Sequence, residues 1–241
     1  MWIEEYATNL TFLIGPKLLG SYLTTQTRTN VQGKVAELRS IASDVRRSRK
    51  PQVWDFSIPR DCPIQFIVNR NRFQVDISGT IKGNGDSIEE VGSLLRVWSL
   101  NKNICYRAGI DAKEVATLFN KTKRRVIIRF HFDRREKKVT NPEPIYHMQI
   151  GGVAHTDENC WFPNLEVPRL QFPPMDVILL SELVLVNFFH EDSRDLREKP
   201  EWKSLVIKSQ KTFQHPYFDS FNSFVKSDTD TILGKLISVS L

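Results

Sequence analysis

The residues best suited to chemistry are two histidines, an arginine and a glutamine in the middle of the chain: Arg129, His131, His147 and Gln149. One imidazole can accept a proton near neutral pH while the other donates one. An arginine can hold a phosphate and stabilise developing negative charge. Together they would permit cleavage of RNA without a metal, because the 2′-hydroxyl of RNA serves as the nucleophile. The alternative is an ordinary polar sheet surface.

Two predicted strands position these four residues, one over 125–134 and one over 145–150. Side chains alternate between the faces of a strand, so the polar residues of each segment share one face and its apolar residues share the other. A hairpin across 135–144 would pair the strands. We therefore expect the four residues on one surface, with cross-strand neighbours about 5 Å apart.

Other residues can join this site. Asp76 and Ser78 lie on the polar face of an earlier predicted strand, and they belong to the site if that strand is adjacent. His155 adds a third imidazole in a loop. Gly151-Gly152 would let the backbone approach a ligand closely, or would simply turn the chain.

A metal or cofactor site is not expected. His131, Asp133 and His147 could supply three ligands, but Asp133 lies at the end of its strand. Glu136-Lys137-Lys138 has the letters of a restriction-type nuclease motif, yet it falls in a predicted hairpin tip. There is no Walker loop, Gly-x-Ser-x-Gly elbow or His-Glu-x-x-His, and Gly83-Asn84-Gly85 lacks the third glycine of a dinucleotide site.

Positive charge is concentrated in the first part of the chain. The whole sequence of 241 residues has a formal net charge of +6, but residues 1–138 carry +11 and residues 139–241 carry −5. Three dense basic runs are candidates for phosphate contacts. Their predicted nucleic-acid-binding residues are Arg46, Arg47, Arg49, Lys50, Lys121, Lys123, Arg124, Arg125, Arg134 and Arg135. Solvated helix ends and hairpin tips are the competing interpretation.

The pattern of elements predicts an α+β fold with a mainly antiparallel sheet. Helices are expected at the N-terminus, over 2–14, over 16–26 after Pro16, and from an Asn30 cap to about Lys50. Apolar residues at helical spacing in this last helix (Val31, Val35, Leu38, Ala42, Val45) predict packing on the core or on the first helices. Strands are expected over 52–58, 64–68, 72–81, 88–100, 104–107, 125–134 and 145–150, with a turn at Gly83-Asn84-Gly85. A short helix over 112–120, capped by Asp111, is expected between the last strands.

The C-terminal third is predicted to be helical. Residues 177–189 read as a buried helix because they are apolar nearly all round. Pro200 begins a helix over about 201–213, and Phe218, Phe221, Phe224 and Val225 line a face of the next one. The conformation of 231–241 is left open between helix and strand.

We therefore expect a helical N-terminal arm (1–50) and a single α+β domain (51–241), strand-rich over 51–152 and helical over 174–226. Glu4 and Glu5 stand where a secretory signal would be basic, which predicts a cytoplasmic protein. Cys62, Cys105 and Cys160 form no Cys-x-x-Cys pair and indicate idle thiols. Apolar runs are too short for a membrane helix, so no membrane partner is expected.

Three functions compete, and whether the chain is an enzyme stays open. The leading hypothesis is a nucleic-acid-binding subunit of a larger assembly, with RNA or DNA on the basic half and a protein partner or self-association through the rest. The alternative is a metal-independent ribonuclease at the histidine and arginine site. The third is a small-molecule enzyme whose loop over 153–173 acts as a lid.

Overall fold

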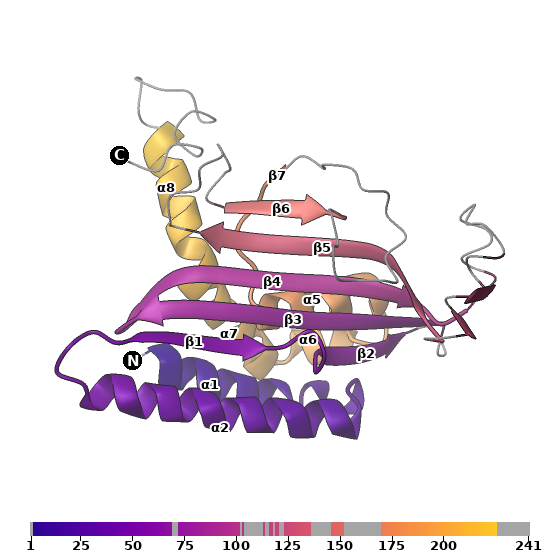
Figure 1. The fold of residues 1–241 in the computed structure, drawn as a ribbon, viewed down its shortest axis with the longest axis horizontal. Helices are drawn as coiled ribbons and strands as arrows, with labels where there is room; N and C mark the ends of the chain where they lie inside the picture. The colour runs from indigo at the N-terminus through magenta and orange to yellow at the C-terminus, as the bar shows by residue number, and fades with distance from the viewer. Residues whose placement is uncertain are drawn as a thin grey trace.

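A computed structural model shows one antiparallel sheet with helices packed on one side (Figure 1). The structure describes residues 2–68, 72–101, 103, 113, 116–117, 119–120, 123–135, 146–151 and 170–225. Every strand pairing is antiparallel, which confirms the predicted α+β class.

The sheet has seven strands in the order β1-β3-β4-β5-β6-β7, and β2 also pairs with β3. Their bounds are β1 Val53–Ile58, β2 Ile64–Val68, β3 Phe73–Asn84, β4 Ser87–Ser99, β5 Arg125–Arg135, β6 Tyr146–Ile150 and β7 Leu170–Gln171. Six of the seven predicted strands are present within a few residues. The long β3–β4 hairpin is the centre of the sheet, and it turns at Gly85, whose φ of +60° suits glycine.

The N-terminal helices depart from the prediction. The helices here are α1 Trp2–Leu13, the 3-10 turn η1 Leu19–Ser21 and α2 Thr25–Arg47. The helix predicted over 16–26 is wrong, because Gly20 folds back on Gly15 and the backbone of Leu23 bridges to Phe66 of β2. The cap of α2 is Thr24, whose hydroxyl accepts from the Thr27 backbone N–H at 3.1 Å, so this helix begins before Asn30.

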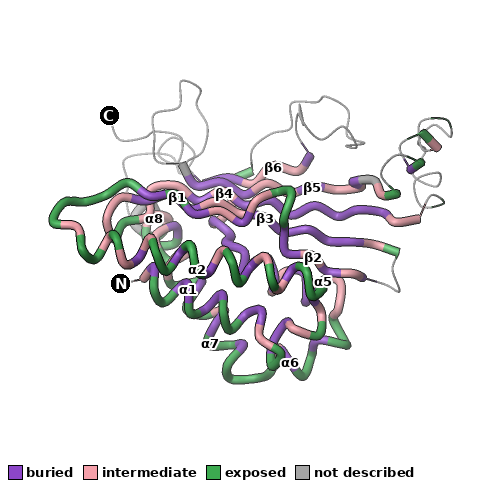
Figure 2. Tube along the Cα trace, turned by 60° about the horizontal axis from the view of Figure 1, so that its bottom comes forward, coloured by how far each residue is buried: buried purple, intermediate pink, exposed green. Residues whose placement is uncertain are grey.

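The core lies between the sheet and the helices. Val31, Val35, Leu38 and Ala42 of α2 are buried in the same hydrophobic cluster as α1 and the sheet, and Val45 packs against it. The N-terminal helices therefore share one core with the strands. Figure 2 shows this layering, with buried segments along the strands and along the inner sides of the helices.

The C-terminal helices complete the same layer. They are α5 Val177–Phe188, α6 Arg194–Glu198, α7 Pro200–Ser209, the π-helical η2 Gln210–Gln214 and α8 His215–Val225. The apolar helix α5 lies directly on β3: a Cβ added to Gly79 would stand 3.0 Å from Val177 Cγ1. The helix predicted to carry Phe218 and Phe221 is present as α8, on which Tyr217 is buried and Phe218 is 48% exposed, and the side chains of Phe224 and Val225 lie outside the described part of the structure.

Several predictions lie outside the described residues: the strand over 104–107, the Asp111 cap, the segment 231–241, and all but the end of the loop predicted over 153–173, where Leu170–Gln171 form β7. The predicted short helix over 112–120 is represented by residues 113, 116–117 and 119–120, which are helical. Of the helices described, none is both long enough and apolar enough to span a bilayer.

Candidate functional site

The sheet has an apolar face toward the helices and a second face rich in polar side chains, here called the polar face. The strand register aligns the cross-strand neighbours on this face in rows. One row joins Asp76, Arg96 and Arg129 of β3, β4 and β5, and another joins Thr80, Gly92, Asp133 and His147. A third joins Ser78, Leu94, His131 and Gln149.

The structure brings the two predicted histidines together around a carboxylate. His131 Nε2 lies 3.2 Å from Asp133 Oδ1, and His147 Nε2 lies 3.5 Å from Asp133 Oδ2. The side chain of His147 is 4% exposed, whereas that of His131 is 26% exposed. Asp133 thus orients both rings, and His131 is the one that solvent or a ligand can reach more readily.

Glycine at position 92 makes room for this arrangement. Gly92 is the cross-strand neighbour of Asp133, and a Cβ added there would stand 3.1 Å from Asp133 Oδ1. A side chain at this position would crowd the carboxylate that holds His131. The His131–Asp133–His147 cluster therefore depends on a residue that carries no chemistry of its own.

Arg129 and Gln149, the other two predicted site residues, lie near the His131–Asp133–His147 cluster. The Arg129 guanidinium donates from Nε and Nη2 to the Gly151 carbonyl oxygen at 2.9 and 2.5 Å, and its residue is 8% exposed. Gly151, with φ of +77°, presents this oxygen. Gln149 is half-buried and is the cross-strand partner of His131. Arg129 is thus committed to the backbone rather than extended toward solvent.

The three-ligand metal hypothesis gains no support from the geometry. Among the described residues, no group of three or more His, Cys, Asp or Glu side chains is arranged to hold a metal ion. His131 and His147 each direct Nε2 to Asp133, so the carboxylate bonds to the rings instead of converging with them on a common point.

A second carboxylate cluster lies on the same face and was not anticipated. Asp76 is 1% exposed and lies 3.7 Å from Arg96 Nη2 and 3.6 Å from Arg124 Nη1. Gln74 donates to its other oxygen at 2.6 Å. Both guanidinium groups also lie over the Trp98 ring, at 5.1 and 4.2 Å from its centroid.

Burial raises the pKa of Asp76, while Gln74 and the two arginines act in the opposite direction. Asp76 does not join the histidine site, because it lies in the row of Arg96 and Arg129 and its charged partners are Arg96 and Arg124. The signal that could have identified this cluster is the alternation itself, which places Asp76 and Arg96 on the polar sides of consecutive hairpin strands.

The three basic runs lie at two ends of the sheet. The run at 46–50 follows α2 and adjoins the β3–β4 turn, where the Gly85 N–H donates to the Gln52 carbonyl at 2.9 Å. Arg135 ends β5 near this end, opposite Glu90, whereas Arg125 begins β5 opposite Ser99. Ten strand steps separate these two positions, or about 34 Å. The runs therefore do not form one continuous surface.

The side chains in these basic runs differ in their exposure and in the groups that they contact. Arg134 is 8% exposed, with its guanidinium 5.7 Å from the centre of the Tyr146 ring. Arg124 belongs to the Asp76 cluster, and Lys123 is exposed. Arg46 forms an ion pair with Glu4. Lys121 and the side chains of Arg125 and Arg135 lie outside the described part of the structure.

The run at 46–50 is the most accessible. Arg47, Arg49 and Lys50 are all exposed, and none has an ion pair with a described residue. We call these three residues the α2 basic corner. Arg47 lies in the last turn of α2 and the other two residues just past it, at the negative end of the helix dipole, which favours cations.

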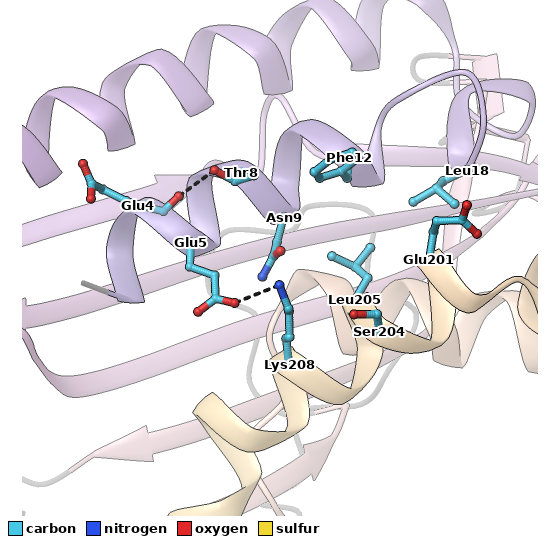
Figure 3. Close-up of a pocket in the computed structure, with 10 residues that line it drawn as sticks. All are labelled: Glu4, Glu5, Thr8, Asn9, Phe12, Leu18, Glu201, Ser204, Leu205 and Lys208. Carbon is cyan, nitrogen blue, oxygen red and sulfur yellow. Dashed lines mark hydrogen bonds and ion pairs between the residues drawn. The ribbon is translucent and has the colours of Figure 1, made fainter.

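A groove lies between α1 and α7, with a volume of about 560 Å³ (Figure 3). Glu5 and Lys208 reach toward each other across it and form an ion pair at 3.0 Å. Phe12 lines the groove and is 60% exposed. Glu4 is paired with Arg46 and Glu5 with Lys208, and no lining residue is a nucleophile held by a base, so the groove resembles a contact surface more than a catalytic site.

Comparison of the chain with models of known protein families, with curated proteins and with solved structures gave no match.

Proposed function

We propose that the protein binds nucleic acid, as a subunit of a larger assembly, and that the α2 basic corner makes the contact. The observation that carries this proposal is that Arg47, Arg49 and Lys50 stay exposed and have no ion pair with a described residue. Cations of this kind can replace the counterions of a phosphate backbone, which is the main source of non-specific affinity for nucleic acid.

The other basic runs support the proposal less. Arg124 is paired with the buried Asp76, and Arg134 is 8% exposed and lies over the Tyr146 ring. Withdrawing Arg124 from its contact would take a charged partner from the buried Asp76 carboxylate. The proposed interface is therefore smaller than the sequence suggested, and it lies at the end of the sheet where β3 turns into β4.

The test is fluorescence anisotropy with labelled single-stranded RNA, duplex RNA and duplex DNA at low salt. We expect wild-type protein to bind at least one of these, and the triple variant Arg47→Ala/Arg49→Ala/Lys50→Ala to bind at least tenfold more weakly. The matched control is Lys17→Ala/Lys203→Ala/Lys211→Ala, which removes the same charge from exposed sites elsewhere. Absence of binding, or equal weakening in both triple variants, would contradict the proposal.

A second candidate function, metal-independent RNA cleavage, is favoured by one specific observation. His131 is partly exposed and its Nε2 lies 3.2 Å from Asp133 Oδ1, and a carboxylate beside an imidazole can orient the ring for proton transfer. The geometry does not present two exposed imidazoles, because His147 is buried. A single accessible histidine would have to act first as base and then as acid.

This candidate is tested on the same RNA in the presence of EDTA. Cleavage would be lost in His131→Ala and retained in the His190→Ala control, since His190 is an exposed histidine near the end of α5. RNA that is bound but stays intact would leave the binding function alone.

The proposal also includes a protein partner, and we assign its contact surface to the groove between α1 and α7. Exposed Phe12 is its most accessible apolar side chain. If the groove receives a protein partner or a second copy, light scattering should show an assembly that Phe12→Ser disrupts. The exposed, unpaired Cys62 supports placing this activity in a reducing compartment such as the cytoplasm.

A further inference from the structure

A small hollow on the polar face has no role in the functions argued so far. It has a volume of about 290 Å³, near the lower limit of about 300 Å³ for small-molecule sites. Its walls come from β1, β3, β4 and β5, which the register places side by side. The lining residues that matter to its chemistry are Ser57, Arg60, Ser78, Thr80, Gly92 and His131.

The hollow exists because one row of the sheet lacks a side chain. Gly92 lies between Thr80 of β3 and Asp133 of β5 in the register. Ser57 of β1 is the cross-strand partner of Thr80 and faces the same side. Arg60, just past the end of β1, closes the rim, and its carbonyl accepts a hydrogen bond from Arg96 at 2.8 Å. The rim is therefore fixed to the Asp76 cluster.

The hydroxyl groups of the hollow have no hydrogen-bond partners in the described part of the protein. This holds for Ser57, Ser78 and Thr80. Ser78 as a residue is 4% exposed, and it lines the hollow. By contrast, Ser93 on the other face is 2% exposed and donates to the Met175 carbonyl at 2.5 Å.

The charge of the lining favours an anion. His131 and Arg60 line the hollow, and no aspartate or glutamate does. Asp133 lies beside His131, with its Oδ1 3.2 Å from Nε2. Hydroxyl donors, an imidazole and a guanidinium together are the groups that proteins use to hold phosphate oxygens.

We propose that this hollow binds the phosphate group of a phosphorylated ligand, through Ser57, Ser78, Thr80, His131 and Arg60. The phosphate can belong to a small phosphate monoester or to the backbone of a nucleic-acid strand. With a strand, the inference deepens the proposed function; with a small ligand, it stands without it.

The experiment is isothermal titration of the full chain with inorganic phosphate, adenosine 5′-monophosphate and phosphate-free adenosine, with single-stranded RNA as a fourth probe. The double variant Ser78→Ala/Thr80→Val removes two hydroxyls that have no hydrogen bond to a described residue. Arg60→Ala is a second, surface variant. Ser87→Ala, at the start of β4 and outside the hollow, is the matched control.

We expect wild-type protein to bind the monophosphate or the RNA, but not adenosine. The double variant and Arg60→Ala should each weaken that binding at least tenfold, with Ser87→Ala unchanged. Weakening of the monophosphate assigns the site to a small ligand, and weakening of RNA alone assigns it to a strand.

The inference is overturned if no phosphate probe binds, or if every probe binds wild type and the double variant equally. The second result is separable from failure of the proposed function. RNA binding that depends on the α2 basic corner but not on Ser78 and Thr80 would keep the proposed function and remove this site.

Discussion

Asp76 and Asp133 lie on the same face of one sheet, with one strand between theirs, and both are nearly inaccessible, at 1% and 4% exposed. Their partners differ. Asp76 faces two guanidinium groups, which stay protonated at any ordinary pH. Asp133 faces two imidazole rings, one buried and one partly exposed, and a neutral imidazole has one donor and one acceptor nitrogen.

The Asp76 cluster therefore serves the fold, whereas the Asp133 cluster includes a ring that a ligand can contact. The Asp76 cluster joins β3, β4 and the residue before β5 through Arg96 and Arg124, and it holds the rim of the hollow through Arg60. The Asp133 cluster presents one partly exposed ring to that hollow. A buried carboxylate is therefore informative about function only when the chemistry of its partners is known.

The largest expected effect is on Asp76. Asp76→Ala leaves the 5% exposed Arg96 without its carboxylate, and an unpaired buried charge costs about 3 to 5 kcal/mol. Urea unfolding monitored by circular dichroism would measure the loss. The control is Asp55→Ala on β1, an exposed carboxylate that should change stability by less than about 0.5 kcal/mol. Equal effects of the two changes would end the assignment of Asp76 as structural.

A smaller loss is expected at Asp133. Asp133→Ala removes the acceptor of two imidazole N–H groups, one of them buried, and an unsatisfied buried donor costs about 1 to 3 kcal/mol. A neutral imidazole is easier to leave unpaired than a guanidinium, so the loss should be less than for Asp76→Ala. The same urea titration at pH 8 tests this, and a larger loss at Asp133 would reverse the comparison.

The pH dependence of stability offers a third test, at a carboxylate on the other side of the sheet. Burial raises the pKa of Asp176, which caps α5 by accepting from the Leu179 N–H at 2.9 Å. A carboxyl with a raised folded pKa loses stability as pH rises from its unfolded value, 3.8, through its folded value.

Asp176→Asn keeps a good cap but removes this titration. We expect the variant to gain stability relative to wild type as the pH is raised from 4 to 7, in thermal melts at matched ionic strength. Parallel pH profiles for the two proteins would show that the Asp176 carboxyl titrates as it does in the unfolded chain.

The smallest expected effect distinguishes two buried serines. Ser93→Ala breaks the bond to the Met175 carbonyl and should cost about 1 kcal/mol. Ser78→Ala breaks no hydrogen bond to a described residue and should change stability by less than about 0.5 kcal/mol. A loss at Ser78 as large as that at Ser93 would mean that its hydroxyl serves the fold, not a ligand.

Sequence patterns predicted the strands well, because alternation is a local property. The same alternation correctly placed Arg129, His131, His147 and Gln149 on one face. It did not reveal what each side chain bonds to, since partners come from strand order. Arg129 bonds to the Gly151 carbonyl, 22 residues away, and Asp76 meets Arg124, 48 positions later.

Charge runs were the least reliable guide. They predicted three phosphate-contacting segments, yet Arg124 and Arg134 lie against aromatic rings and the two ends of β5 are about 34 Å apart. The position of a basic residue in the sequence does not show whether its side chain points to solvent or packs against the rest of the protein. Among the described cations of the three runs, Arg47, Arg49 and Lys50 are exposed together, where α2 ends at Arg47 and before β1 begins at Val53, and Lys123 is exposed by itself.

The most direct test of nucleic-acid association is the salt dependence of RNA affinity, measured for wild type and for the Arg47/Arg49/Lys50 alanine variant. Each phosphate contact on a single strand contributes about −0.7 to the slope of log affinity against log salt. We predict that the variant's slope is shallower by about 2, as expected for three lost contacts. Identical slopes, or no salt-sensitive binding in the wild type, would contradict the proposal.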